Sequence, residues 1–259
     1  MDPNLIQAGL DSLPESTVEK ILNPTAEVLG DSAGGLVRTI FYPLLHLNIF
    51  TKKKLEDYEQ KIANNVKDIP EKYRDPSMLP IFLETLEKSK YKVGDDEIRS
   101  MFENILTKSL DSRYNSSISP RYANVVSQLS PKDASYLQLM NKERTTFNTI
   151  LNAKLSSLPV AKLIDLNNNS SDMTKPFLLV SDHIPRNLWL TIDNLEGLGI
   201  AKLDFNSYLH YNLATELYEE FKDFSGHPEF ISSSDLKIAT LKGVLKFTSF
   251  GQNLLDIIE

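Results

Sequence analysis

Two helix-start signals stand close together near the middle of the chain. Ser119-Pro120 and Ser130-Pro131 each place a serine immediately before a proline. A serine just before a helix accepts a hydrogen bond from a free backbone N–H, and proline suits the first helical position because it has no N–H to leave unsatisfied. The residues between the two signals carry an apolar face made of Tyr122, Val125, Val126 and Leu129. The segment therefore predicts one short helix that runs directly into a second.

The chain before that segment has the pattern of successive helices. Apolar residues recur at spacings of three and four over 54–69 and over 98–110, with charged residues between them. That spacing places the apolar side chains on one face of a helix. Asp95-Asp96 precedes the second stripe, where carboxylates accept free N–H groups and interact favourably with the helix dipole. We predict helices over these two segments and over 79–86.

Beyond residue 145 short β-favouring runs alternate with helical ones. We expect strands over 160–166, 176–180 and 200–205, and helices over 186–198, 208–224 and 249–258. Lys242-Gly243 lies between two apolar runs and predicts the turn of a hairpin over 238–248. Helix, helix and then a strand hairpin is the order of a winged-helix unit.

Chain length and these patterns together set the predicted fold class. At 259 residues the chain exceeds the size that one hydrophobic core comfortably organises, so we expect two domains. We predict a mainly α protein. Its helical N-terminal domain covers residues 1–129, and an α+β winged-helix-like C-terminal domain covers residues 130–259.

The composition excludes several classes of protein. Cysteine is absent, which rules out disulfides, thiolate catalysis and cysteine-based zinc sites. The net charge of -7 is spread over both halves and disfavours a general binder of polyanions. The N-terminus lacks a basic stretch followed by an apolar one, so we expect no secretory signal and a cytoplasmic location.

The most apolar segment covers residues 36–50. It is shorter than the roughly 20 apolar residues that cross a bilayer, and it contains Arg38 and Pro43. We expect a buried helix that bends near Pro43. The alternative is a peripheral membrane helix, supported by the lysines at 52–54. Its membrane-contacting residues would be Ile40, Phe41, Leu44 and Leu45.

No group of residues has the spacing of a catalytic or metal site. The histidines are scattered, and His210 falls in a segment expected to be a half-buried helix. Asp95-Asp96-Glu97 is explained by its place at a helix start. Gly34-Gly35 and Gly197-Leu198-Gly199 lack the features of a phosphate-binding loop. We therefore expect no metal, no cofactor and no enzymatic activity.

A winged helix raises the question of nucleic-acid binding. The candidate contacts are Lys237, Lys242 and Lys246 near the predicted hairpin, and Arg186 at the start of the helix that would enter a groove. That helix also carries Asp193 and Glu196 and offers little positive charge. Specific DNA binders commonly neutralise about 6–10 phosphates. Nucleic acid therefore stays a disfavoured partner for this acidic chain.

Several blocks of the sequence resemble one known family. These blocks are residues 69–73, 96–106, 128–134, 193–200 and 245–251, and Pro76 and Ser119-Pro120 belong to the same pattern. Together they are similar to the abortive infection alpha family, and the similarity extends over most of the chain. The resemblance implies a bacterial protein associated with resistance to bacteriophage. It supplies no catalytic motif, because the matching residues are mostly apolar or helix-capping.

We therefore expect a non-enzymatic interaction protein that acts in phage resistance by abortive infection and binds a phage or host factor. Two alternatives remain open. One is a toxic effector that perturbs the membrane through residues 36–50. The other is a nucleic-acid-binding regulator that works through the winged helix. The oligomeric state does not follow from the sequence.

Overall fold

The computed structural model describes residues 35, 37, 52–167, 171–172, 174–182, 186–224 and 238–259. The chain divides into two compact units. The first unit contains residues 1–131 and 256–259, and the second contains residues 132–255. Within the predicted helix over 36–50 the structure describes Val37, which is buried and helical. The rest of that segment lies outside the described residues.

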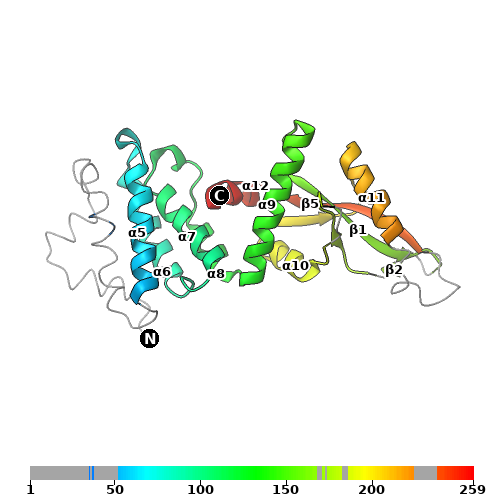
Figure 1. Cartoon of the computed structure of the whole chain (residues 1–259), viewed down its shortest axis with the longest axis horizontal. Coiled ribbons are helices and arrows are strands. Elements are labelled where there is room, and N and C mark those ends of the chain that lie inside the picture. Colours follow the sequence, from blue (N-terminus) through cyan, green and yellow to red (C-terminus); the bar gives the residue numbers. More distant parts are fainter. Residues whose placement is uncertain are drawn as a thin grey trace. The chain divides into compact units, whose positions relative to one another are not determined.

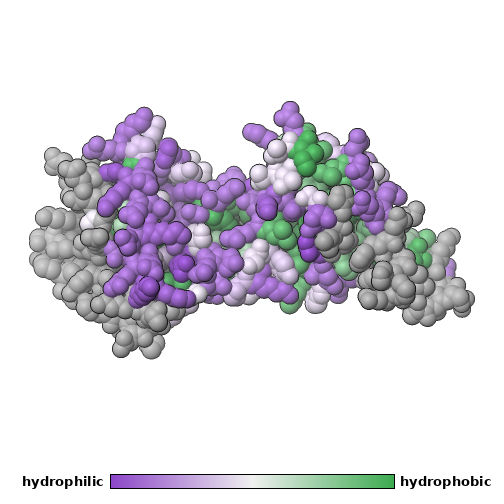
Figure 2. Space-filling model, in the orientation of Figure 1, coloured by the Kyte–Doolittle hydropathy of each residue, from purple (hydrophilic) through white to green (hydrophobic). Residues whose placement is uncertain are grey.

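The first unit is helical (Figure 1). Its described helices are α5 (Lys52–Asp68), α6 (Leu79–Ser89), α7 (Asp96–Lys108) and α8 (Pro120–Gln128). Three short 3-10 turns connect them: η1 (Glu71–Tyr73), η2 (Pro76–Met78) and η3 (Ser112–Tyr114). The helices predicted over 54–69, 79–86 and 98–110 are confirmed, and their apolar stripes meet in a buried core. The outward face of α5 is hydrophilic (Figure 2).

The predicted helix starts are confirmed at the atomic level. The Asp95 carboxylate accepts the N–H of Ile98 at 2.9 Å, at the start of α7. The Ser119 hydroxyl accepts the N–H of Arg121 at 3.3 Å, and Pro120 is the first residue of α8. The next helix, α9 (Pro131–Leu151), likewise begins at a proline.

The second unit places an antiparallel sheet among helices (Figure 1). Its strands are β1 (Ser157–Asp165), β2 (Ser171–Asp172), β3 (Phe177–Leu178), β4 (Ala201–Asp204) and β5 (Ile238–Phe247). The order is β2-β1-β5-β4, and β3 also pairs with β1. The remaining helices are α10 (Trp189–Gly197), α11 (Asn212–Phe224) and α12 (Ser249–Ile258).

The predicted hairpin at Lys242-Gly243 is wrong. Strand β5 continues through this dipeptide and pairs with β1 along the whole length of β1, with Gly243 opposite Val160. A Cβ added at Gly243 would lie 2.5 Å from the Phe205 ring and 2.9 Å from the Asp204 carbonyl oxygen. The glycine therefore permits close packing inside a strand and does not form a turn. Since the described residues lack this hairpin, the C-terminal sheet does not show the predicted winged-helix arrangement.

Two of the resembling blocks, 193–200 and 245–251, meet where α12 begins. The Thr248 hydroxyl donates to the Gly199 carbonyl oxygen at 2.7 Å and accepts the Gly251 N–H at 2.9 Å. The Thr248 N–H donates to the Ile200 carbonyl oxygen at 3.0 Å. One threonine thus caps α12 and attaches it to the residue that precedes β4.

A residue of the block 193–200 also protects the outer edge of β4. The Glu196 carboxylate accepts the N–H of Leu203 at 2.8 Å. An edge strand with free N–H groups can pair with another chain, so a side chain that occupies one of them disfavours aggregation. The residues of this block therefore have structural roles.

Helix α11 packs on β1 and β5. The Tyr218 hydroxyl donates to the Gly243 carbonyl oxygen at 2.6 Å and accepts the Leu209 N–H at 3.4 Å. Burial raises the pKa of Tyr218 to about 12, and the hydrogen bond from Leu209 offsets part of that rise.

This raised pKa predicts a loss of stability at alkaline pH. The folded state favours the neutral phenol, so its contribution is complete below pH 10.0 and is lost as the pH approaches about 12. Urea unfolding across that interval is expected to show a steeper decline for wild type than for Tyr218→Phe. The exposed Tyr91 provides the control, because Tyr91→Phe should keep the wild-type slope. Equal slopes for all three proteins would contradict this assignment.

Candidate functional site

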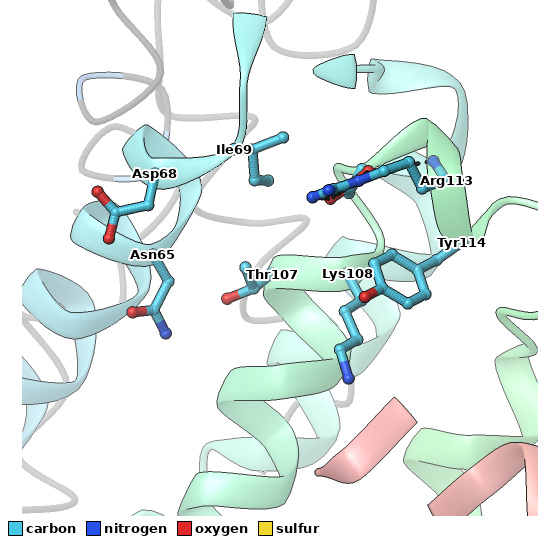
Figure 3. Close-up of a pocket in the computed structure, with 8 residues that line it drawn as sticks. Asn65, Asp68, Ile69, Thr107, Lys108, Arg113 and Tyr114 are labelled. Atoms are coloured by element: carbon cyan, nitrogen blue, oxygen red, sulfur yellow. Dashed lines mark hydrogen bonds and ion pairs between the residues drawn. The ribbon is translucent and has the colours of Figure 1, made fainter. Parts of the chain in front are cut away.

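The first unit contains an open pocket where the C-terminal ends of α5 and α7 come together with η3 (Figure 3). Its volume is about 220 Å³. The lining residues are Asn65, Asp68, Ile69, Thr107, Lys108, Asp111, Arg113 and Tyr114. Ile69 begins the resembling block 69–73, so one end of that block lies at the pocket.

Both cationic residues of the pocket are held by groups of the same unit. The Lys108 ammonium donates to the Asp256 carbonyl oxygen at 2.8 Å, and it lies 5.2 Å from the centre of the Tyr114 ring. Burial lowers the pKa of Lys108, while attraction to Glu259 and Asp256 opposes that shift. A lysine at the carbonyl end of a helix satisfies a carbonyl that has no partner within the helix. Lys108 therefore stabilises the last turn of α12.

Arg113 makes a two-pronged contact with the buried carboxylate of Asp111. Its Nε lies 2.9 and 3.0 Å from the two carboxylate oxygens, and its Nη2 lies 2.5 Å from Oδ2. This hydrogen-bonded pair raises the pKa of Arg113, so the guanidinium stays charged. The central carbon of the guanidinium lies 4.9 Å from the centre of the Tyr73 ring. These contacts fix η3 against η1.

Within the described part of the chain, no cluster of three or more His, Asp or Glu side chains is arranged to hold a metal ion. Asn65 and Asp68 line the pocket from α5 (Figure 3). The contacts of Lys108 and Arg113 are explained by the fold.

The sheet register separates Arg186 from Lys242. Arg186 bridges to Leu178, and Leu178 lies opposite Val160 on β1. Lys242 lies opposite Ala161, the next residue of β1. Because directly paired residues share a face and successive residues alternate, Arg186 and Lys242 belong to opposite faces of the sheet. Arg186 also forms an ion pair with Asp182.

The other predicted nucleic-acid contacts have different surroundings. The Lys242 ammonium lies 2.9 Å from the carboxylate of Glu219 on α11. Lys246 is exposed and lies directly opposite Lys202 on β4. Lys237 lies outside the described residues. Of the four predicted basic residues, the structure therefore places only Lys242 and Lys246 on a common face.

The predicted membrane contacts, Ile40, Phe41, Leu44 and Leu45, lie outside the described residues. Among the helices that are described, none has the length and apolar character needed to cross a bilayer.

The sequence prediction missed an exposed aromatic loop before α11. The sequence predicts a helix with half-buried side chains over 208–224, but α11 begins only at Asn212. Tyr208 is 45% exposed and Tyr211 is 40% exposed. The overlooked signal is Asp204-Phe205-Asn206-Ser207, because Asp, Asn and Ser in succession favour a turn.

Comparison with known proteins identifies the family. The sequence matches the family described as abortive infection alpha over residues 51–258, which includes every helix and strand from α5 to α12. No curated protein and no solved structure matches the chain. The family match covers well over half of the sequence and includes all five blocks that carried the resemblance. The chain therefore belongs to the abortive infection alpha family.

Proposed function

We propose that this chain is a non-enzymatic interaction protein that acts in phage resistance by abortive infection. In this proposal it binds a protein of the phage or of the host, and infection converts that contact into arrest of the host cell. The observation that carries the proposal is the family match over residues 51–258.

The contacts of the resembling blocks support a binding role. Thr248 caps α12, and Glu196 covers a strand edge. Ile200 and Gly251 are in close backbone contact. Since these residues are occupied in building the fold, recognition of a partner is expected to depend on exposed side chains.

Nucleic-acid binding is the second candidate, and the placement of Lys242 and Lys246 on one face favours it. We expect at most weak binding of a DNA duplex at about 150 mM salt. Fluorescence anisotropy over a range of salt concentrations tests this. If the affinity of wild type for DNA falls steeply with salt concentration, and the fall is shallower for the double variant Lys242→Glu, Lys246→Glu, the nucleic-acid function is favoured instead.

A membrane effector acting through residues 36–50 is the remaining alternative. Liposome flotation of wild type and of the variant Ile40→Asp, Leu44→Asp tests it. A membrane function would be supported if wild type floats with the liposomes and the variant does not.

The proposed interaction is tested by purifying the tagged full chain, after nuclease treatment, from infected and uninfected cells. A protein that is recovered in stoichiometric amounts and whose recovery changes upon infection is the expected result. Recovery of nucleic acid alone, or of no partner from either culture, would contradict the proposal.

A further inference from the structure

The loop between β4 and α11, residues 205–211, has the composition of a recognition loop. We name it the tyrosine loop. It combines Tyr208, His210 and Tyr211 with Asn206 and Ser207, and all five are exposed. Tyrosine offers a large contact area with few rotatable bonds, while asparagine and serine supply adaptable hydrogen bonds. This combination is typical of surfaces that bind proteins.

Both ends of the tyrosine loop are fixed to the fold. The Asp204 carboxylate accepts the Asn206 N–H at 2.8 Å and the Ser207 hydroxyl at 2.6 Å. Farther along, the Leu209 N–H donates to the Tyr218 hydroxyl. The Tyr211 carbonyl accepts the Thr215 N–H at 2.9 Å, in the first turn of α11. A loop that is already ordered loses less conformational entropy when it binds.

The fold itself places a cation on this surface. The Lys242 ammonium lies 5.9 Å from the centre of the Tyr208 ring and 5.4 Å from that of the Tyr218 ring. It also contacts the Glu219 carboxylate at 2.9 Å. Tyrosine faces attract cations at such distances, and a neighbouring carboxylate adds to the attraction. The chemistry of the surface therefore suits lysine and arginine side chains.

The exposed face of α11 beside the loop also favours lysine and arginine side chains. Glu216, Glu219 and Glu220 are exposed on α11, and Asp204 stands at the root of the loop. Hydrogen bonds from Ser207 and Asn206 lower the pKa of Asp204, so its carboxylate is ionised at neutral pH. Over β4, β5 and α11 the carboxylates outnumber the ammonium groups by one, because these elements carry five acidic residues (Asp204, Glu216, Glu219, Glu220 and Asp223) and four basic ones (Lys202, Lys222, Lys242 and Lys246).

We infer that the tyrosine loop and the exposed face of α11 form a docking surface for a basic, arginine- or lysine-bearing segment of a protein partner. The inference rests on the proposed function as an interaction protein. Tyr208 and Tyr211 supply the aromatic contacts, and Glu216 supplies the charge at one end of the surface.

The test measures binding of the full chain to two capped synthetic peptides, one an arginine-glycine repeat and the other a glutamate-glycine repeat. We expect the arginine peptide to bind and the glutamate peptide not to bind. The double variant Tyr208→Ala, Tyr211→Ala should weaken binding by about tenfold or more. Glu216→Lys, a surface change that leaves the loop intact, should weaken it as well. The matched control is Tyr91→Ala, which removes an exposed tyrosine of the first unit and should bind like wild type.

Several results would overturn the inference. The first is failure of the arginine peptide to bind, and the second is equal binding of both peptides. The third is that the double variant Tyr208→Ala, Tyr211→Ala and the variant Glu216→Lys bind the arginine peptide with the same affinity as wild type. If the same variants lose oligothymidine binding or self-association but keep peptide binding, the surface belongs to a different occupant. That result would also overturn the inference.

A phage assay separates this inference from the proposed function. If wild type protects cells and the double tyrosine variant protects equally well, the docking surface is wrong while the proposed function stands. If wild type itself gives no protection, the proposed function fails whatever the peptides show.

Discussion

Replacing Gly251 with alanine is expected to destabilise the protein by about 1–3 kcal/mol, with a larger loss for valine. A Cβ at this position would lie 1.9 Å from the Ile200 carbonyl oxygen and 2.8 Å from its carbonyl carbon. Both are backbone atoms in the segment that leads into β4, and they cannot move aside as a flexible side chain can. The start of α12 would have to shift and lose its attachment through Thr248. Urea unfolding followed by circular dichroism measures the change.

Gly197 provides a matched control for this prediction. It is the last residue of α10, and a Cβ added there would meet no atom within 4 Å. Gly197→Ala is expected to leave stability unchanged or to raise it by up to about 1 kcal/mol, because alanine restricts the unfolded chain. If Gly251→Ala proved as stable as Gly197→Ala, the close contact between α12 and Ile200 would not exist in the folded protein.

The second large effect concerns a buried carboxylate in the helical unit. Glu103 on α7 is only 2% exposed, and its Oε2 lies 2.5 Å from the Lys61 ammonium. Its Oε1 lies 3.5 Å from Nε of Arg99, which also pairs with Asp96 at 2.9 Å. The double variant Lys61→Met, Arg99→Met leaves this carboxylate buried without a counter-charge. We expect it to destabilise the protein by about 3–5 kcal/mol.

Removing the carboxylate and keeping its two cationic partners should cost much less stability. Glu103→Met removes the buried charge, while Lys61 is 55% exposed and can be solvated and Arg99 keeps Asp96 as its partner. A buried ion pair replaced by an apolar side chain of similar size is often neutral or stabilising, so we expect little loss of stability. Chemical denaturation of both variants gives the comparison. A loss for Glu103→Met as large as that for the double variant would contradict this asymmetry.

The local signals in the sequence predicted the helical unit well. Ser119 and Asp95 identify helix starts because a capping side chain acts within its own turn, and the stripe over 54–69 repeats with the helical period. Such features depend on residues close in the sequence. They could therefore be recognised without knowledge of the tertiary structure.

Features that depend on distant residues were predicted poorly. Gly243 suggested a turn, but its surroundings include Phe205 and Val160, which are far away in the sequence. The pattern around Tyr208 predicts a half-buried helix, whereas hydrogen bonds to Asp204 and Tyr218 hold its loop outside α11. The separation of Arg186 from Lys242 likewise follows from strand register, which only the assembled sheet defines.

The family blocks have a consistent physical meaning in this structure. They cap α12, protect a strand edge and bring α12 against Ile200, and each of these contacts involves a backbone group. Members of a family can share such a framework while their exposed loops recognise different partners. The tyrosine loop, which lies outside all five blocks, fits this division.

In the proposed function this chain confers phage resistance through binding by its folded form. The most direct measurement is the efficiency of plating of a panel of phages on cells that express wild type, Gly197→Ala or Gly251→Val, compared with cells that carry an empty vector. The account predicts fewer plaques for at least one phage with wild type and Gly197→Ala, and loss of that protection with Gly251→Val. Equal plating of every phage on all four strains would contradict the claim.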